Sequence, residues 1–596
     1  MPTKLGQFLY RRFDHQSRGS RAAGPGLRPN VIWIRGPWPG WEPDLNPNQA
    51  TPGAARDTLG MIDREGTLTH QNGFEKVGSA YLPLGGTSPP DVGSEEPVVC
   101  IAMGRTKSTQ AVRRYAITGD STLGHFYELV AGVWDEIPFD TNASSGPAGI
   151  VCDSSDPAST LFDSAHYSEA DYTVFASGSA NGLIRFPGIV ATEYEYLAGL
   201  GSLTTLTANS VCRAEERLHA FGTVENGTSF PTRWRWTNKG ASGAFDPTGT
   251  GAGFADLASE LGGEGIAVRQ LGPKMALYTT TGTLLARRTN QTTDPFAKDY
   301  VAEGRGLLST HSVAQIAPGI HFGIFTDGWF MLRSDGTWNE LGVTDKGYHK
   351  WRREFYGSLD WTNRKRVICE YDENDHWVYI AFPQTGAAGN GPSVVWVYDI
   401  INNTCWPAPD WTYKPNVFGG IVEEASTGLT WGDFTGIPWS SGTGSWGSYE
   451  STTGQRRVLH GTANGLVYVH LPSLVTQDGV LPSYRYQSHY FAGEAPEAHK
   501  KIDGLYLGYT RVQDADAADP SPVSLSYQNE DGTQAIGAIE QTKGTVNTEQ
   551  VDFTNPGAVS GLQHRFVVSG TTPIKIGAVG VQITGSSGKA RREESA

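Results

Sequence analysis

Short apolar runs rich in Val, Ile, Tyr, Phe and Trp recur along the whole chain, and Gly, Asn, Asp and Pro bound them. This pattern is typical of β-strands joined by tight turns. Helical periodicity is brief by comparison, and it predicts short helices only at Gly253–Leu261 and Tyr348–Leu359. Several strand junctions are dipeptides that tolerate a positive φ, as two-residue hairpin turns require. These are Asn181-Gly182, Asp327-Gly328, Asp335-Gly336, Asn464-Gly465 and Asp531-Gly532.

The predicted strands group into antiparallel units. Ile320–Leu341 reads as three strands joined by two Asp-Gly turns, and residues 366–407 as a hairpin followed by two more strands. Similar units occur at Val98–Pro138, Gly149–Pro187, Ser210–Trp236 and Gly265–Arg288. Four short antiparallel strands form one blade of a β-propeller, so residues 95–472 are predicted to fold as a propeller of about six or seven blades.

A weak internal repeat supports this prediction. Ser179–Phe186 and Thr462–Val469 share the core Ala-Asn-Gly-Leu followed by apolar and aromatic residues. Equivalent positions of two blades are expected to share such a hairpin and its register.

The character of the chain changes after Pro472, where Trp becomes rarer and Thr, Ser and Val more frequent. Strands are predicted at Tyr484–Phe491, Lys501–Thr510, Ser521–Tyr527, Gln550–Phe553, Arg565–Ser569 and Ile574–Thr584. They indicate a smaller β-sandwich over residues 482–588. The expected fold class is therefore all-β. A basic arm over residues 1–30 and an extended or β segment over 31–94 precede the propeller, and a mobile charged tail over 589–596 ends the chain.

Charge narrows the classes of function. The chain has 62 acidic and 47 basic residues, a formal net charge of −15, which disfavours a protein that grips nucleic acid over its whole surface. An acidic wall past which DNA slides remains compatible with this charge.

The basic arm, with Arg11, Arg12 and Arg28, could contact phosphates, but docking onto a neighbouring acidic subunit fits the acidic bulk of the chain better. No stretch reaches the roughly 18 apolar residues of a membrane span.

Motifs of catalysis are missing from the sequence. It has no HExxH, no GxSxG elbow and no phosphate-binding GxxxxGK[ST] loop, and its five cysteines are far apart and odd in number. We therefore predict no catalytic, cofactor-binding or metal residues, no cofactor and no enzyme activity. The cysteines are expected to be small buried hydrophobic residues.

Three patterns leave alternatives open. Ser334–Trp338 resembles the Asp-box of sialidase-type propellers, although its Asp and Gly are adjacent as in an ordinary hairpin turn. A pair of carboxylates could serve glycoside hydrolysis across a propeller centre, but the spacing selects no pair. The carboxylates considered are Asp360, Glu370, Asp372 and Asp375. Trp431, Trp439 and Trp446 could form a sugar-stacking surface or pack between blades.

A series of short segments in a fixed order carries a family resemblance. The segments are Arg217–Phe221, Phe230–Trp236, Gly243–Thr248, Ala255–Leu257, Lys274–Tyr278, Gly304–Leu307, Gly323–Leu332 and Trp396–Asp399 with Trp406. Together with a terminal sandwich from about Tyr484, this order resembles the tail tube or nozzle propeller proteins of short-tailed bacteriophages. The resemblance covers residues 200–590.

The resemblance implies a virion structural protein, a tail nozzle or hub subunit in a homo-hexameric ring around the DNA ejection channel. It implies contacts with the portal-adaptor proteins above and with tail fibre or spike proteins, and only transient passage of DNA. It also implies location in the virion tail after assembly in the host cytoplasm. The alternative from another class is a carbohydrate-binding or glycan-hydrolysing β-propeller, because fold alone does not separate the two.

Overall fold

The computed structural model describes residues 30–585 except for 36–37, 46–48, 51–53, 65–66, 78–95, 106–111, 120–123, 131–132, 141–149, 179–180, 188–192, 241–244, 247–250, 290, 292–294, 423–455, 472–473, 475, 490–499, 512–522, 530–533, 540–548, 555–558, 562–563 and 572–573. In this part the chain is nearly all β-sheet, as its short apolar runs predict. Several predicted features lie outside it: residues 1–29 of the basic arm predicted over 1–30, Trp431, Trp439, Trp446, Asp531-Gly532 and the tail over 589–596.

Helix is scarce among the described residues. They contain one α-helix, α1 (Arg352–Ser358), and two 3-10 turns, η1 (Pro157–Ser159) and η2 (Arg364–Arg366). The helix α1 confirms the prediction within Tyr348–Leu359. The helix predicted at Gly253–Leu261 is wrong, because its first residues form strand β17 (Gly253–Asp256), whose backbone pairs with the preceding strand from Trp236↔Gly253 to Arg233↔Asp256.

Seven sheets of the described part have four antiparallel strands each. Sheet 1 comprises β6 (Val98–Arg105), β7 (Val112–Thr118), β8 (His125–Val130) and β9 (Val133–Ile137). Sheet 2 comprises β10 (Asp163–Tyr167), β11 (Tyr172–Ala176), β12 (Ile184–Pro187) and β13 (Glu195–Tyr196). Sheet 3 comprises β14 (Leu206–Ala214), β15 (Arg217–Glu225), β16 (Thr228–Trp236) and β17.

The next four sheets follow the same plan. Sheet 4 comprises β18 (Gly265–Leu271), β19 (Lys274–Thr279), β20 (Gly282–Arg288) and β21 (Phe296–Glu303). Sheet 5 comprises β22 (Val313–Ala317), β23 (Ile320–Ile324), β24 (Trp329–Arg333) and β25 (Trp338–Glu340). Sheet 6 comprises β26 (Ile368–Asp372), β27 (Trp377–Phe382), β28 (Val394–Asp399) and β29 (Thr404–Pro407). Sheet 7 comprises β30 (Pro415–Val422), β31 (Arg456–Thr462), β32 (Val467–Leu471) and β5 (Gly73–Lys76).

The local sequence signals place these strands well. The meander predicted over Ile320–Leu341 is β23 to β25, and the four strands predicted within residues 366–407 are those of sheet 6. Asp327-Gly328 and Asp335-Gly336 connect successive strands of sheet 5, and Gly336 has the positive φ of 92° that its turn requires. The two copies of the repeat lead into β12 and β32, each the third strand of its sheet.

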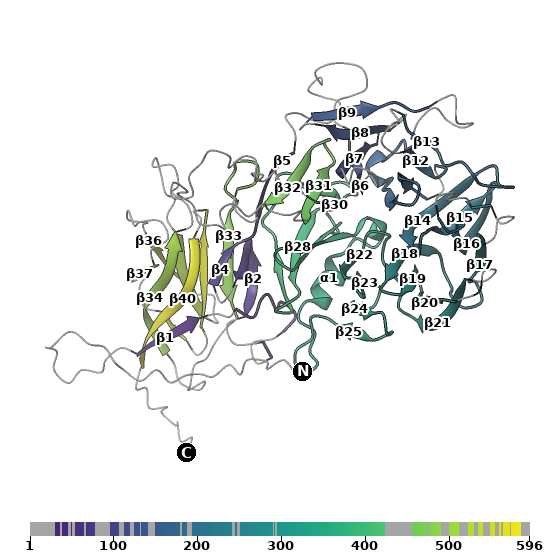
Figure 1. The fold of residues 1–596 in the computed structure, drawn as a ribbon. Coiled ribbons are helices and arrows are strands. Elements are labelled where there is room, and N and C mark those ends of the chain that lie inside the picture. Colours follow the sequence, from purple (N-terminus) through teal and green to yellow (C-terminus); the bar gives the residue numbers. More distant parts are fainter. Residues whose placement is uncertain are drawn as a thin grey trace, which may run out of the picture.

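The seven sheets have a propeller-like arrangement (Figure 1). The first strands of neighbouring sheets are in contact, from β6 through β10 and β14 to β18, and again from β22 through β26 and β30 back to β6. Sheets 4 and 5 meet where His321 Nε2 donates to the carbonyl of Gln270 at 2.9 Å. The fourth strands β9, β17, β21 and β25 lie at the periphery in this view. The first strands of the sheets therefore surround a common centre.

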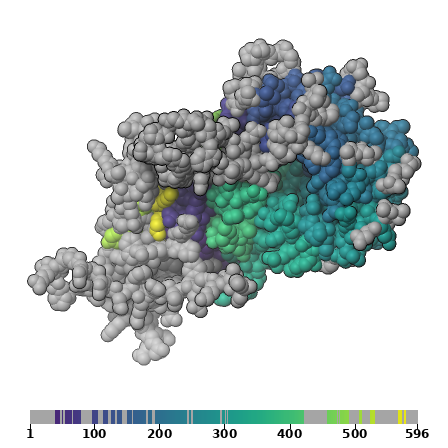
Figure 2. Space-filling model, viewed as in Figure 1, coloured from purple at the N-terminus to yellow at the C-terminus, as the bar shows by residue number. Residues whose placement is uncertain are grey.

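Two further sheets combine both ends of the described chain. Sheet 8 comprises β1 (Asn30–Arg35), β3 (Met61–Arg64), β4 (Thr67–His70), β34 (Lys500–Arg511), β37 (Glu549–Thr554), β38 (Val559–Gly561) and β40 (Ile574–Gly585). Sheet 9 comprises β2 (Ala55–Leu59), β33 (Tyr484–Ser488), β35 (Val523–Asn529), β36 (Gln534–Ile539) and β39 (His564–Gly570). Figure 2 shows the N-terminal (purple) and C-terminal (yellow) parts side by side.

The segment 31–94, expected as an extended or β segment, supplies strands to three sheets. It contributes β5 to sheet 7, β3 and β4 to sheet 8, and β2 to sheet 9. The reason is apolar burial at long range, since Phe74 of β5 is fully buried against Trp411, His460 and Tyr468. These partners lie more than 300 residues after Phe74, so the local sequence around β5 does not predict them.

Candidate functional site

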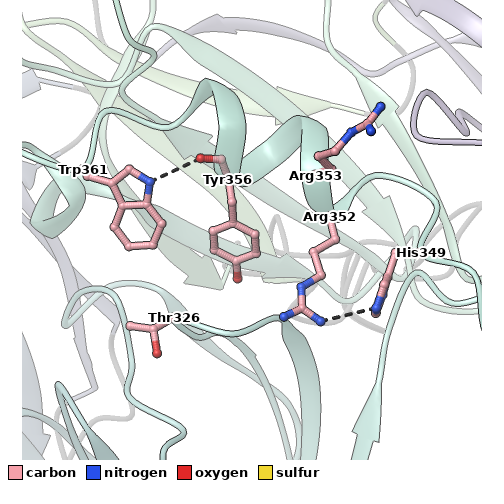
Figure 3. A pocket seen from close by; sticks show the side chains of 6 residues that line it. All are labelled: Thr326, His349, Arg352, Arg353, Tyr356 and Trp361. Atoms are coloured by element: carbon pink, nitrogen blue, oxygen red, sulfur yellow. Dashed lines mark hydrogen bonds between the residues drawn. The ribbon is translucent and has the colours of Figure 1, made fainter.

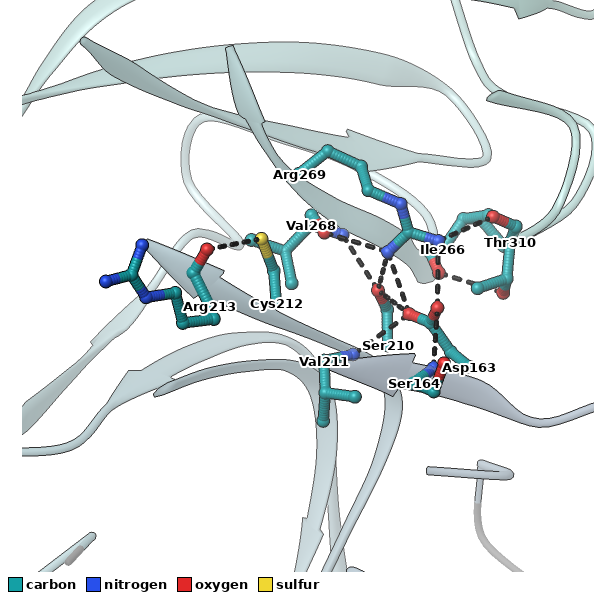
Figure 4. A network of polar contacts seen from close by, with 10 residues as sticks. All are labelled: Asp163, Ser164, Ser210, Val211, Cys212, Arg213, Ile266, Val268, Arg269 and Thr310. Atoms are coloured by element: carbon teal, nitrogen blue, oxygen red, sulfur yellow. Dashed lines mark hydrogen bonds and ion pairs between the residues drawn. The ribbon is translucent and has the colours of Figure 1, made fainter. Parts of the chain in front are cut away.

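A buried ion pair joins three sheets at their common centre (Figure 4). The Asp163 carboxylate at the start of β10 forms two hydrogen bonds with the Arg269 guanidinium of β18, at 2.8 Å from Nη1 and 3.0 Å from Nη2. Ser210 of β14 lies between them. It donates to Asp163 at 2.6 Å and accepts from Arg269 Nη1 at 2.9 Å. Arg269 Nη2 also donates to the carbonyl of Thr310 at 3.2 Å, which extends the network to sheet 5.

The electrostatics of this network keep the Arg269 guanidinium charged. Burial acts to lower the pKa of Arg269, but the charge and hydrogen bonds of Asp163 outweigh it and raise that pKa. The Asp163 carboxylate also accepts the backbone amide of Val211 at 3.0 Å. Its oxygens are thus occupied by an arginine, a serine and an amide, so Asp163 is a structural anchor.

A second network joins the remaining inner strands. Asn416 of β30 donates to the carbonyl of Val98 in β6 at 2.8 Å, and its side-chain oxygen accepts from Arg366 next to β26. Arg366 also pairs with Asp156 at 3.2 Å. Between sheets 5 and 6, the amide of Cys369 donates to the carbonyl of His311 at 2.7 Å. The centre of the seven sheets is thus held by polar contacts between successive sheets.

The carboxylates considered for hydrolysis have structural contacts. Asp372 and Asp375 lie at the turn between β26 and β27, where Asp372 accepts the amide of Asn374 at 2.9 Å and Asp375 pairs with Arg64 at 3.4 Å. Burial, with the nearby charge of Asp375, raises the pKa of Asp372. Asp360 accepts the amide of Thr362 at 2.9 Å in a separate turn. Glu370 lies on β26, two residues before Asp372. Of this set, Glu370, Asp372 and Asp375 thus belong to one hairpin, and Asp360 lies in a different turn.

The Asp-box-like segment Ser334–Trp338 forms the hairpin turn between β24 and β25. Asp335 accepts the amide of Thr337 at 2.8 Å, and this bond lowers the pKa of the exposed Asp335 carboxyl. The ordinary-hairpin interpretation is thus the one that the strand pairing supports. All five cysteines are free thiols, four of them buried and Cys212 half-buried, as predicted.

A shallow pocket of about 420 Å³ lies beside α1, and polar and aromatic side chains gather there (Figure 3). Its lining comprises Thr326, His349, Arg352, Arg353, Tyr356 and Trp361. They come from the turn after β23, from α1 and from the residues on either side of the helix. Cationic and aromatic groups thus face one small space.

The start of α1 is fixed by a residue distant in sequence. Trp351 at the N-cap makes no side-chain cap bond. Asp44 replaces it, accepting the amides of Arg353 at 2.5 Å and Glu354 at 3.0 Å. Such a carboxylate satisfies amides that the first helical turn leaves unpaired. Asp44 therefore sets the position of the helix that carries Arg352 and Tyr356.

The sequence patterns miss both places as sites. Asp163 and Arg269 are 106 residues apart and belong to different sheets, so no local spacing connects them. The pocket gives a partial signal, because the predicted helix Tyr348–Leu359 contains four of its six lining residues.

Among the described residues, no group of three or more His, Cys, Asp or Glu side chains could hold a metal ion. Within the same ranges, no helix is both long enough and apolar enough to cross a bilayer. No protein-family model and no curated protein sequence matches the chain.

Proposed function

We propose that the seven four-stranded sheets are the blades of one closed β-propeller over residues 95–472, and that β5 completes the seventh blade. Sheets 8 and 9 then form a β-sandwich from residues 482–588 and the N-terminal strands β1 to β4. Contacts of the first strands in cyclic order support this proposal, as does the pairing of β32 with β5.

This module serves as a virion structural protein, a tail nozzle or hub subunit. The observation that carries the proposal is the Asp163–Arg269 ion pair, since both of its charged groups are used to hold three sheets together at the centre. A ring of sheets held together by buried ion pairs at its centre suits a subunit that bears mechanical load. Sheets 8 and 9, which combine strands from both ends of the chain, suit the same role. The order of segments shared with phage nozzle proteins supports the same role.

In this role the chain forms a homo-hexameric ring in the virion tail, below the portal and adaptor and in contact with fibre or spike proteins. DNA passes through the ring without tight binding. The formal charge of −15 per chain supports weak contact with DNA, because like charges repel phosphates within roughly 8 Å at physiological salt.

Electron microscopy of the purified full-length chain tests this role. A hollow six-fold ring, alone or on addition of the portal-adaptor proteins, is the expected result. A chain that stays monomeric under both conditions contradicts the proposal.

The second candidate is a carbohydrate-binding or glycan-hydrolysing propeller, and the aromatic and cationic pocket beside α1 is the observation in its favour. Hydrolysis of host surface glycans by the purified chain, abolished by replacing one carboxylate, would establish it over the structural role.

A further inference from the structure

The pocket beside α1 has an aromatic wall whose polar ends are already occupied. Tyr356 and Trp361 stack with ring centroids 5.9 Å apart and planes 22° apart. The Tyr356 hydroxyl donates to the carbonyl of Phe325, and Trp361 Nε1 donates to the carbonyl of Tyr356 at 3.2 Å. Trp361 nevertheless remains 42% exposed. The wall therefore offers ring faces, and its O–H and N–H donors are both already used.

Opposite this wall, Arg352 retains unused donors. Its Nη1 donates to Glu340 at 3.3 Å and to His349 Nε2 at 3.4 Å. Its Nε and Nη2 groups make no hydrogen bond with a side chain or carbonyl in the described ranges. A guanidinium presents five N–H donors, and those on Nε and Nη2 match the two oxygens of a carboxylate. Figure 3 shows Arg352 on the side of the pocket opposite Trp361.

The neighbours of Arg352 fix which groups can pair with a ligand. Arginine only donates, so His349 accepts through Nε2. Its Nδ1 lies 3.5 Å from Glu340, so Arg352 and His349 both lie beside this carboxylate. The other polar groups of the lining are the exposed hydroxyl of Thr326 and the guanidinium of Arg353. Burial raises the pKa of Tyr356, so its phenol stays neutral.

We propose that this pocket binds an acidic saccharide, with a pyranose ring packed on Trp361 and its carboxylate bonded to Arg352. The C–H groups of a pyranose suit the electron-rich face of an indole. A neutral sugar would leave the Nε and Nη2 groups of Arg352 unpaired, and an acidic amino acid side chain would leave the ring face uncovered. A volume of about 420 Å³ falls in the range of small-ligand sites. This site does not depend on the tail role or on assembly of a ring.

Saturation-transfer NMR on the full-length chain tests the proposal, with methyl glucuronide and methyl glucoside as the acidic and neutral probes. Transfer to the ring protons of the glucuronide is expected, with roughly tenfold weaker affinity for the glucoside, because a charged hydrogen bond is lost. The variant Arg352→Gln should weaken glucuronide binding by about tenfold and abolish the preference between the probes. Trp361→Ala should remove ring-proton transfer from both.

The matched control is Arg288→Gln, which alters another half-exposed arginine paired with a glutamate, Glu215 at 2.6 Å. It should leave both affinities unchanged, and thermal melting should confirm that all variants fold. Equal affinity for the two sugars, or an Arg352→Gln variant that binds like the parent, would overturn the proposal. A third result would also overturn it: equimolar N-acetylglutamate displaces the glucuronide, and the bound glucuronide shows no saturation transfer to its ring protons. This result would identify a site for acidic peptides.

Discussion

Sheets 2 to 4 and sheet 7 surround the same centre, but different chemistry holds them. The first group is joined by a charged lock, the Asp163–Arg269 pair with Ser210 between them. Sheet 7 is closed by the distant strand β5, whose Phe74 lies among aromatic rings and two buried imidazoles, His460 and His470. The charged lock stabilises the centre only while both the carboxylate and the guanidinium are present. The cluster of Phe74, His460 and His470, called the aromatic lock below, is stable only while its imidazoles are uncharged. The two regions should therefore fail under different perturbations.

The hydrogen bonds of the aromatic lock determine which imidazole nitrogens carry a hydrogen. His460 Nε2 donates to the carbonyl of Tyr413 at 3.2 Å, so its Nδ1 accepts from His470 Nε2 at 3.0 Å. The Nδ1 atom of His470 is then a bare acceptor, without a hydrogen-bond partner in the described part of the chain. A proton added there would be a charge enclosed by Tyr379, Trp411 and Phe74.

The largest effect is expected from breaking the charged lock. Asp163→Ala leaves the Arg269 guanidinium without its partner and should lower the free energy of unfolding by about 3–5 kcal/mol. Urea denaturation measures the loss. Asp345→Ala, at an exposed turn, is the control and should change little. If Arg269→Met added to Asp163→Ala restores no stability, the loss does not arise from an unpaired charge.

The aromatic lock should respond to loss of volume by a comparable amount. Phe74→Ala removes a fully buried ring and should cost about 3–5 kcal/mol, with β5 exchanging its amide hydrogens faster than β14. Glu75→Ala alters the exposed neighbour on the same strand and is the matched control. Equal protection of β5 in the parent and in Phe74→Ala would show that the ring does not hold this strand.

Low pH should destabilise the aromatic lock through its two buried histidines. Burial lowers the pKa of His460 from 6.5 to about 3, and burial with the neighbouring His460 lowers that of His470 well below 6.5. Between pH 6.5 and 3 the unfolded chain binds protons that the folded chain excludes, so stability is full above pH 6.5 and falls as pH decreases. For His460 the loss at pH 5 is about 2 kcal/mol. Stability measured against pH should be flatter for His470→Phe, and an unchanged slope would contradict this assignment.

The smallest effect belongs to ion pairs at the surface. Lys365 and Glu264 pair at 3.1 Å between sheets 4 and 6, with side chains 63% and 42% exposed. Lys365→Ala should change the free energy of unfolding by less than about 1 kcal/mol, because solvent screens the pair. A loss as large as that of Asp163→Ala would mean that burial is not what distinguishes the central lock.

Sequence patterns predict the local parts of this molecule and miss the distant ones. Asp327-Gly328 and Asp335-Gly336 specify their own hairpins, so sheet 5 is predicted nearly strand by strand. The partner of Phe74 is not predictable in this way, since β5 pairs with a strand almost at the other end of the propeller-like part. The same holds for Asp163 and Arg269, whose contact depends on how three sheets meet. The pocket is intermediate, because α1 was predicted but its exposed Trp361 and its cap Asp44 were not.

The position of β5 has a consequence for how the chain is made. Synthesis runs from the N-terminus, so β5 leaves the ribosome long before β32, its only ladder partner in the described ranges. Sheets 1 to 6 can form in order as each set of strands emerges, because their pairings are local. Sheet 7 must wait, and until then Phe74 and the open edge of β5 are exposed to other chains. Nascent chains should therefore be most prone to aggregation just before residue 471 emerges, and co-expressed chaperones should raise the yield of the full chain.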